Sequence, residues 1–309
     1  MHRLTIFACL GIALMPVTVH AGDMLLTSAD GTVTFRGSYG ITAIKANEFV
    51  YEGKTKVSQL IWKSQGISTF TGDAMVQLDR KFYLKAVGTV GFGGNGHMAD
   101  YDWFNANGPW THRSLHPDTK LDHYLALSLE AGREILSHDG TSVSLGGGVK
   151  YTDVKWSAYG GSYVYSDTGF RADRGNFPDG EKGISYKQQW PVPYLGINAS
   201  HSQGAWTLAG ALQGGIAVEG TGTDDHWMRD LRFIDHFDTI PVVMTSASVE
   251  YEFRPETAFY ISGSMDKMFD TRADTREINK STGGKRWYRN DAGADYQSMT
   301  VSLGLRGQF

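Results

Sequence analysis

The chain has 309 residues, with 29 Lys and Arg against 33 Asp and Glu, and a formal net charge of −4 at pH 7. This mildly acidic balance excludes a general nucleic-acid-binding protein, for which a basic surface is expected. Glycine (38) and the aromatic residues (8 Trp, 15 Tyr and 15 Phe) are abundant, and helical patterning is nearly absent. We therefore expect a β protein in which residues 22–309 form a single domain.

Residues 1–21 are predicted to be a secretory signal peptide and not part of the fold. Arg3 provides a positive start, an apolar run extends from Leu4 to Met15, and Val19 to Ala21 has the small-residue pattern of a cleavage site. The only cysteine, Cys9, lies in the apolar run. A lipid anchor would require cleavage directly before it, which is too early. Loss of the signal peptide would then exclude disulfides, thiolate metal sites and cysteine nucleophiles.

Several segments after residue 21 alternate apolar and polar residues. From Met299 to Phe309 the odd positions are mostly apolar and the even positions polar or small, which is the period of a half-buried strand. A soluble sandwich would show the same pattern, but the terminal Phe309 resembles the end signature of bacterial outer-membrane barrels. The expected fold class is all-β, a ten-stranded antiparallel transmembrane β-barrel. Its strands are predicted at about 31–45, 55–78, 81–92, 122–136, 141–159, 184–200, 204–219, 241–254, 257–270 and 296–309.

Short and long connections alternate between these segments. Tight turns are expected at residues 79–80, 137–140, 201–203 and 254–256, and long connections at 93–121, 160–183, 220–240 and 271–295. Outer-membrane barrels place short turns in the periplasm and long loops outside the cell. Because a strand needs only about 9–11 residues to cross a bilayer, the longer segments predict a barrel that extends above the outer membrane. A barrel of this size is narrow and filled by side chains, which argues against a passive channel.

Two acidic stretches on the predicted outer rim form the candidate active site. In an extended backbone Asp224 and His226 point the same way, and a carboxylate beside a histidine orients it as a general base. Asp100 and Asp102 repeat this spacing, and one of two neighbouring carboxyl groups tends to hold a proton. Because neither a Gly-x-Ser-x-Gly nor a His-Glu-x-x-His motif is present, water is the expected nucleophile and no metal is expected. Solvated polar loops also contain such stretches, so the residues alone leave both interpretations open.

The surrounding motifs resemble those of the omptins, the outer-membrane aspartyl-type endopeptidases. Asp100-Tyr101-Asp102-Trp103 is followed by Pro109-Trp110-Thr111 and His116-Pro117-Asp118-Thr119. Further matching stretches cover essentially the whole mature chain: Lys56-Val57-Ser58-Gln59-Leu60, Gly160-Gly161-Ser162-Tyr163, Gly169-Phe170-Arg171, Phe177-Pro178-Asp179-Gly180-Glu181 and Tyr186-Lys187-Gln188.

This resemblance implies a surface endopeptidase that cleaves near basic residues. It implies that an Asp224–His226 couple faces an Asp100–Asp102 pair across a groove. It also implies activation by lipopolysaccharide, with no other cofactor. The expected partners are therefore peptide or protein substrates and the lipid of the outer membrane, with the active site on the extracellular side.

Two departures from the family pattern affect specificity and lipid binding. Members selective for basic side chains often have two acids in the specificity pocket; Glu48 resembles one, but Gly222 stands where the other is expected. In the lipid-contact strand, Tyr151, Asp153 and Lys155 retain an altered version of the motif, and Gln189 replaces a basic residue. The resemblance therefore predicts a broader preference and an altered dependence on lipopolysaccharide. The alternative function is a surface adhesin or host-protein-binding barrel with minor proteolytic activity.

Overall fold

The computed structural model describes residues 32–79, 81–105 and 108–309. The predicted signal peptide, residues 1–21, lies outside them and stays a prediction. The strands are β1 (Val33–Glu52), β2 (Thr55–Gln77), β3 (Phe82–Phe92), β4 (Asn95–Asp102), β5 (His112–His138), β6 (Thr141–Tyr159), β7 (Ser162–Tyr165), β8 (Asp173–Asn176), β9 (Lys182–Gln203), β10 (Trp206–His226), β11 (Leu231–Arg254), β12 (Thr257–Asn279) and β13 (Lys285–Gln308). A 3₁₀ turn, η1 (Trp227–Arg229), separates β10 from β11. Within these ranges, no helix has the length and apolar character required to cross a membrane.

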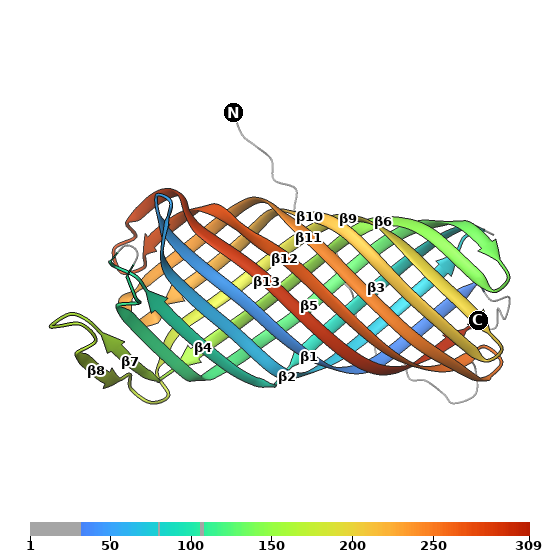
Figure 1. Cartoon of the computed structure of the whole chain (residues 1–309), viewed down its shortest axis with the longest axis horizontal. Coiled ribbons are helices and arrows are strands. Elements are labelled where there is room, and N and C mark those ends of the chain that lie inside the picture. Colours follow the sequence, from blue (N-terminus) through green and yellow to red (C-terminus); the bar gives the residue numbers. More distant parts are fainter. Residues whose placement is uncertain (1–31, 80, 106–107) are drawn as a thin grey trace.

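The strands form one antiparallel sheet that curls into a barrel (Figure 1). The hydrogen-bonded order is β3-β2-β1-β13-β12-β11-β10-β9-β6-β5, and β3 also pairs with β5, so the order returns to its start. β4 continues the line of β3 between β2 and β5 after a break at Gly93 and Gly94, both of which have positive φ. The short β7–β8 hairpin pairs back onto β5 and projects at the end opposite the C terminus (Figure 1). The predicted all-β barrel class is confirmed.

The alternation of side chains explains why the sheet closes. On β13 the apolar residues Met299, Val301, Leu303 and Leu305 face outward, and Leu303 is 61% exposed. Their neighbours Thr300 and Ser302 face the interior, where Thr300 bonds to Thr42 and Ser302 to Ser262. An apolar outer face and a polar interior match a barrel whose solvent outside is lipid.

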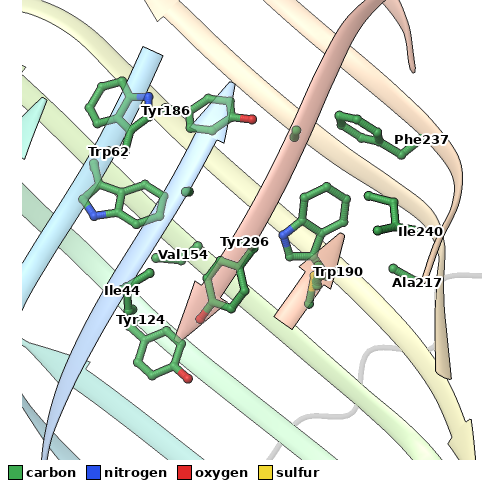
Figure 2. Packing of buried hydrophobic residues seen from close by; sticks show 14 of the residues in the cluster. Ile44, Trp62, Tyr124, Val154, Tyr186, Trp190, Ala217, Phe237, Ile240 and Tyr296 are labelled. Carbon is green, nitrogen blue, oxygen red and sulfur yellow. The ribbon is translucent and has the colours of Figure 1, made fainter. Parts of the chain in front are cut away.

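A layer of aromatic side chains fills the interior below one rim. Trp62, Trp156, Tyr186, Trp190 and Tyr296 are fully buried, and Figure 2 shows Trp62 of β2, Trp190 of β9 and Tyr296 of β13 in this layer. Trp62 stacks on Trp156 and Tyr186 with ring centroids 6.1 and 5.8 Å apart. A polar cavity lies further down the barrel, between residues such as Arg36 and Glu130. The packed layer agrees with a lumen filled by side chains and not with an open pore.

The segments predicted as long loops at 93–121, 220–240 and 271–295 are mostly strand, which corrects the sequence interpretation, whereas most of 160–183 lies outside strands. β10 runs to His226 and β11 starts at Leu231, while β4 and the start of β5 occupy much of 93–121. The outward apolar side chains form a belt around the barrel, and above this belt no lipid faces the strands. Their outer side chains are polar there, so the alternation of apolar and polar residues is lost although the strands remain hydrogen-bonded. The turn expected at 201–203 lies at 204–205, between β9 and β10.

Candidate active site

Asp224 and His226 lie at the end of β10 and face the same side. The Asp224 Oδ2 atom is 2.7 Å from His226 Nε2, and the two side chains are 3% and 14% exposed. This contact places the imidazole proton on Nε2, which donates a hydrogen bond to the carboxylate. Nδ1 is then the basic nitrogen. Asp225, between them, points to the opposite face, where Arg232 and Lys280 pair with it. Asp224 and His226 therefore point the same way, as their spacing in an extended strand predicts.

Asp100 and Asp102 lie on β4, across the barrel mouth from β10. Burial raises the pKa of Asp100 well above its usual value, and the Asp102 and Asp224 carboxylates raise it further. Burial also raises the pKa of Asp102, whereas Ser58, His112, Arg229 and His226 lower it. These mutual interactions bring the four predicted residues into one electrostatic cluster, in which Asp100 is the group most inclined to keep its proton.

Four neighbours of the cluster were missed by sequence reasoning. The Ser58 hydroxyl donates to Asp100 Oδ1 at 3.3 Å, and the Arg229 guanidinium lies 3.4 Å from His226 Nδ1. His112 is the cross-strand partner of Asp102, and Asp235 that of Gly222. Only Arg229 carried a sequence signal, because it follows His226 by one turn. The other three come from separate strands and depend on register.

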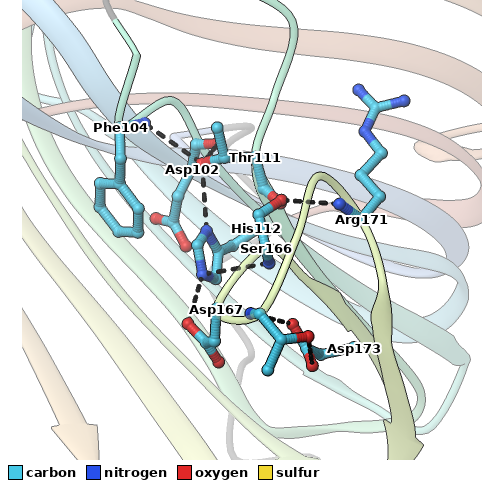
Figure 3. A network of polar contacts seen from close by, with 9 residues as sticks. Asp102, Phe104, Thr111, His112, Ser166, Asp167, Arg171 and Asp173 are labelled. Atoms are coloured by element: carbon cyan, nitrogen blue, oxygen red, sulfur yellow. Dashed lines mark hydrogen bonds and ion pairs between the residues drawn. The ribbon is translucent and has the colours of Figure 1, made fainter.

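His112 connects the active-site rim to the β7–β8 hairpin. Figure 3 shows its ring between Thr111 and Asp167, with contacts of 3.1 Å to each. The Ser166 hydroxyl donates to the Thr111 carbonyl at 2.7 Å. The backbone N–H of Thr111 donates in turn to the Asp102 carbonyl at 2.7 Å. The hairpin is therefore bonded to the segment that positions one of the candidate catalytic acids.

Glu48 and Gly222, the predicted specificity residues, lie in the same region. Glu48 is buried at the upper end of β1, and burial raises its pKa well above the usual value, with Asp224, Asp235 and Asp100 adding to the rise. Gly222 lies on β10 two residues before Asp224 and pairs with Asp235 of β11. The structure therefore brings a further acid, Asp235, to the position where sequence comparison found one missing.

The predicted lipid-contact residues share the outer face of β6. Gln189 of β9 donates to Tyr151 Oη at 2.5 Å and to Asp153 Oδ2 at 3.0 Å. Lys187 pairs with Asp153 at 3.1 Å, whereas the ion pair of Lys155 with Asp122 is longer, at 3.9 Å. The described residues contain no group of three or more His, Cys, Asp or Glu side chains able to hold a metal ion.

Comparison with known proteins gives a consistent result. Residues 29–309 match the family model described as "Omptin family". "Protease 7" of Escherichia coli O157:H7 is 30% identical over 281 residues, covering 88% of this chain and 89% of the relative. The "Plasminogen activator" of Yersinia pestis is 29% identical over 281 residues, covering 89% of each chain. The crystal structure of the outer-membrane protease OmpT from Escherichia coli superposes with a TM-score of 0.86 at 26% identity, covering 93% of this chain and 99% of that chain.

Proposed function

The chain belongs to the omptin family and is an outer-membrane peptidase, and from this premise we propose that it hydrolyses peptide bonds next to basic residues by attack of activated water. The proposed active site faces the extracellular side, and its catalytic residues are Asp224, His226, Asp100 and Asp102. The observation that carries the proposal is the 2.7 Å Asp224–His226 contact facing a second pair of interacting acids.

The proposed mechanism starts with His226. Its Nδ1 atom takes a proton from water while the water oxygen bonds to the scissile carbonyl carbon. Asp224 holds the imidazole by its Nε2–H and stabilises the positive charge that forms. When the C–N bond breaks, the imidazolium returns the proton to the leaving amine, so the products are an amine and a carboxylic acid, which then releases its proton to solvent.

Asp100 and Asp102 have different proposed roles because their environments differ. The strongly raised pKa of Asp100 favours its protonated form, which donates a hydrogen bond to the carbonyl oxygen as negative charge develops there. Asp102 receives compensating interactions from His112, Arg229 and His226, which favour an ionised carboxylate able to hold the attacking water. This division makes the site an aspartyl-type centre assisted by histidine.

The test is turnover of a dibasic fluorogenic peptide by protein reconstituted with lipopolysaccharide. Asp224→Ala and His226→Ala should each lower kcat/KM by about 100-fold or more, because general-base catalysis is lost. Asp238→Ala is the matched control, since it removes a carboxylate exposed on the outer side of β11 and should retain activity. Unchanged turnover in either active-site variant contradicts the assignment.

We also propose that lipopolysaccharide binds the outer wall at Tyr151, Asp153 and Lys155 as the activating lipid. Support comes from their shared position on the outward face of β6, directly above the exposed apolar residues Leu145 and Val149. Lys187 adds a second cation to this surface. Ammonium groups just above an apolar belt are placed to meet lipid phosphates.

A further inference from the structure

Four acids meet at the rim, and among the described residues none of them forms a salt bridge with a Lys or Arg. Glu48 of β1, Asp224 of β10 and Asp235 of β11 are buried, Asp100 of β4 is half-buried, and the one ion pair of this group in the described part of the chain is the contact of Asp224 with His226. The Oε2 atom of Glu48 and the Oδ1 atom of Asp224 are buried and accept no hydrogen bond. Unpaired buried carboxyl groups are costly, so this arrangement points to a cationic group that is absent from the chain itself.

The opposite face of β10 provides an internal comparison. There Asp225 is buried to a similar extent, but Arg232 and Lys280 contact its two carboxylate oxygens at 2.9 and 3.2 Å. The chain therefore supplies cations where a carboxylate has a structural role. It supplies none beside Glu48 and Asp235, which leaves those carboxyl groups available to a ligand.

Gly222 makes room for the Asp235 carboxylate. The two residues are cross-strand partners of β10 and β11. A Cβ atom on residue 222 would lie 3.1 Å from Asp235 Oδ2 and 3.2 Å from Tyr186 Oη, closer than side-chain atoms normally approach. An acid at position 222 and an acid at position 235 would thus compete for the same space, and this chain has the second arrangement.

We propose that Asp235 is a specificity-determining residue which, together with Glu48, binds the positively charged side chain of the substrate residue next to the scissile bond. It provides from β11 the carboxylate that β10 lacks at Gly222. The preference for basic residues is therefore retained and not broadened. This inference rests on the proposed peptidase activity of the same site.

The chemistry of the pocket favours a guanidinium or ammonium ligand. Two carboxylates can accept several N–H groups of an arginine, and charge-assisted hydrogen bonds are about twice as strong as neutral ones. Asp235 is also close enough to Asp224 for the two carboxylates to interact, so a side chain held there places its own peptide bond beside the Asp224–His226 couple. The proposed binding and catalytic groups are close because Gly222, the cross-strand partner of Asp235, is only four residues from His226 on β10.

The experiment compares two peptides that differ only in arginine or its uncharged isostere citrulline before the scissile bond. Wild type in lipopolysaccharide should prefer arginine by at least about 100-fold in kcat/KM, because loss of the cation leaves buried carboxylates unpaired. Asp235→Asn should lower this ratio about tenfold or more while cleavage of the citrulline peptide continues. Asp238→Asn, which changes an exposed carboxylate on the same strand, is the control and should keep the wild-type ratio.

A second variant moves the carboxylate to the neighbouring strand. Gly222→Asp alone should lower activity, because the new side chain crowds Asp235 and Tyr186. Gly222→Asp combined with Asp235→Ala should restore most of the arginine preference. A double variant that cleaves both peptides equally well overturns the proposal.

The outcomes separate this inference from the proposed activity. If Asp235→Asn cleaves both peptides with the wild-type ratio, the role of Asp235 is wrong and the peptidase assignment stands. If wild type cleaves neither peptide, the proposed activity fails. For a variant without turnover, calorimetric binding of arginine amide decides: loss of binding relative to wild type supports the proposal, and unchanged binding overturns it.

Discussion

At the scale of single residues, the carboxyl groups of the candidate site differ in the direction in which their surroundings shift the pKa. Asp225 is paired with cations and burial does not prevent its pKa from being lowered, whereas the pKa values of Glu48 and Asp100 are raised well above the usual range. Carboxyl groups thus differ with their surroundings: Asp225 is a charged structural partner of two cations, whereas Glu48 and Asp100, on β1 and β4, tend to hold their protons.

Asp235 should make the substrate preference depend on pH. Burial raises its pKa to about 7, and the Asp224 carboxylate contributes to the rise. A carboxyl group gains its negative charge as the pH rises through its pKa. The arginine-to-citrulline ratio should therefore increase between pH 6 and pH 8.

The charged and titratable groups facing Asp235 are Glu48 of β1, Asp224 of β10 and Tyr186 of β9. Using the ratio of two peptides cancels effects of His226 ionisation on the chemical step, since both substrates share it. In Asp235→Asn the increase with pH should be reduced. A ratio that is flat from pH 6 to pH 8 in wild type contradicts this assignment.

At the scale of elements, Arg171 adds to the contacts that hold the β7–β8 hairpin against the rim. Arg171 lies 3.4 Å above the Trp110 ring and donates to the Trp110 carbonyl at 2.9 and 3.1 Å. Its backbone N–H donates to Ser166 Oγ at 2.9 Å. Trp110 immediately precedes the Thr111–His112 segment that bonds to Asp102 and Asp167, so the hairpin and the acid pair share one anchor.

Arg171→Ala should loosen the hairpin and weaken catalysis without abolishing it. Loss of the cation–π contact and two hydrogen bonds weakens the attachment of residues 162–176 to the rim, although the pairing of β7 with β5 remains. Hydrogen exchange in that segment should become faster, and kcat should fall by a few-fold as Asp102 loses support. Arg174→Ala, an exposed arginine on β8, should leave both measurements at wild-type values. Unchanged exchange in Arg171→Ala contradicts the anchoring role.

At the scale of the whole molecule, an apolar belt around the barrel and a polar rim above it divide the protein between lipid and water. The strands cross the belt and continue beyond it to the site, while the aromatic layer of Figure 2 closes the interior beneath the catalytic cluster. The proposed active site is thereby supported from below. The cation-bearing patch on β6 and β9 lies at the boundary between these two environments.

The position of that patch predicts which substitutions alter lipid activation. Lys155→Ala combined with Lys187→Ala should raise the lipopolysaccharide concentration needed for half-maximal activity about 30-fold, because each of the two lysines near an anionic lipid surface contributes about 1 kcal/mol. Maximal activity at saturating lipid should stay near wild type. Lys120→Ala, an exposed lysine on β5, is the control. An unchanged half-maximal concentration in the double variant contradicts the proposed lipid site.

Much of this architecture could be predicted from the sequence. Lipid outside and a polar lumen inside impose a period-two pattern wherever a strand crosses the belt, which is why β3 and the C-terminal half of β13 could be located from the sequence. The two-residue spacing of Asp224 and His226 is local to one extended strand, so their common direction also followed from the sequence. Beyond the belt this constraint disappears, and the sequence pattern predicts loops where the upper parts of β5, β10, β11, β12 and β13 are found.

What only the tertiary structure decided is which residues of different strands meet. Gly222 by itself indicated a missing carboxylate and a broader preference, because nothing in the local sequence connects it to Asp235. The register of β10 against β11 makes them neighbours, and closure of the ring brings Glu48 and Asp100 to the same cluster. Register and closure depend on pairing summed over whole strands, so the composition of the proposed specificity pocket is a property of the barrel and not of any one segment.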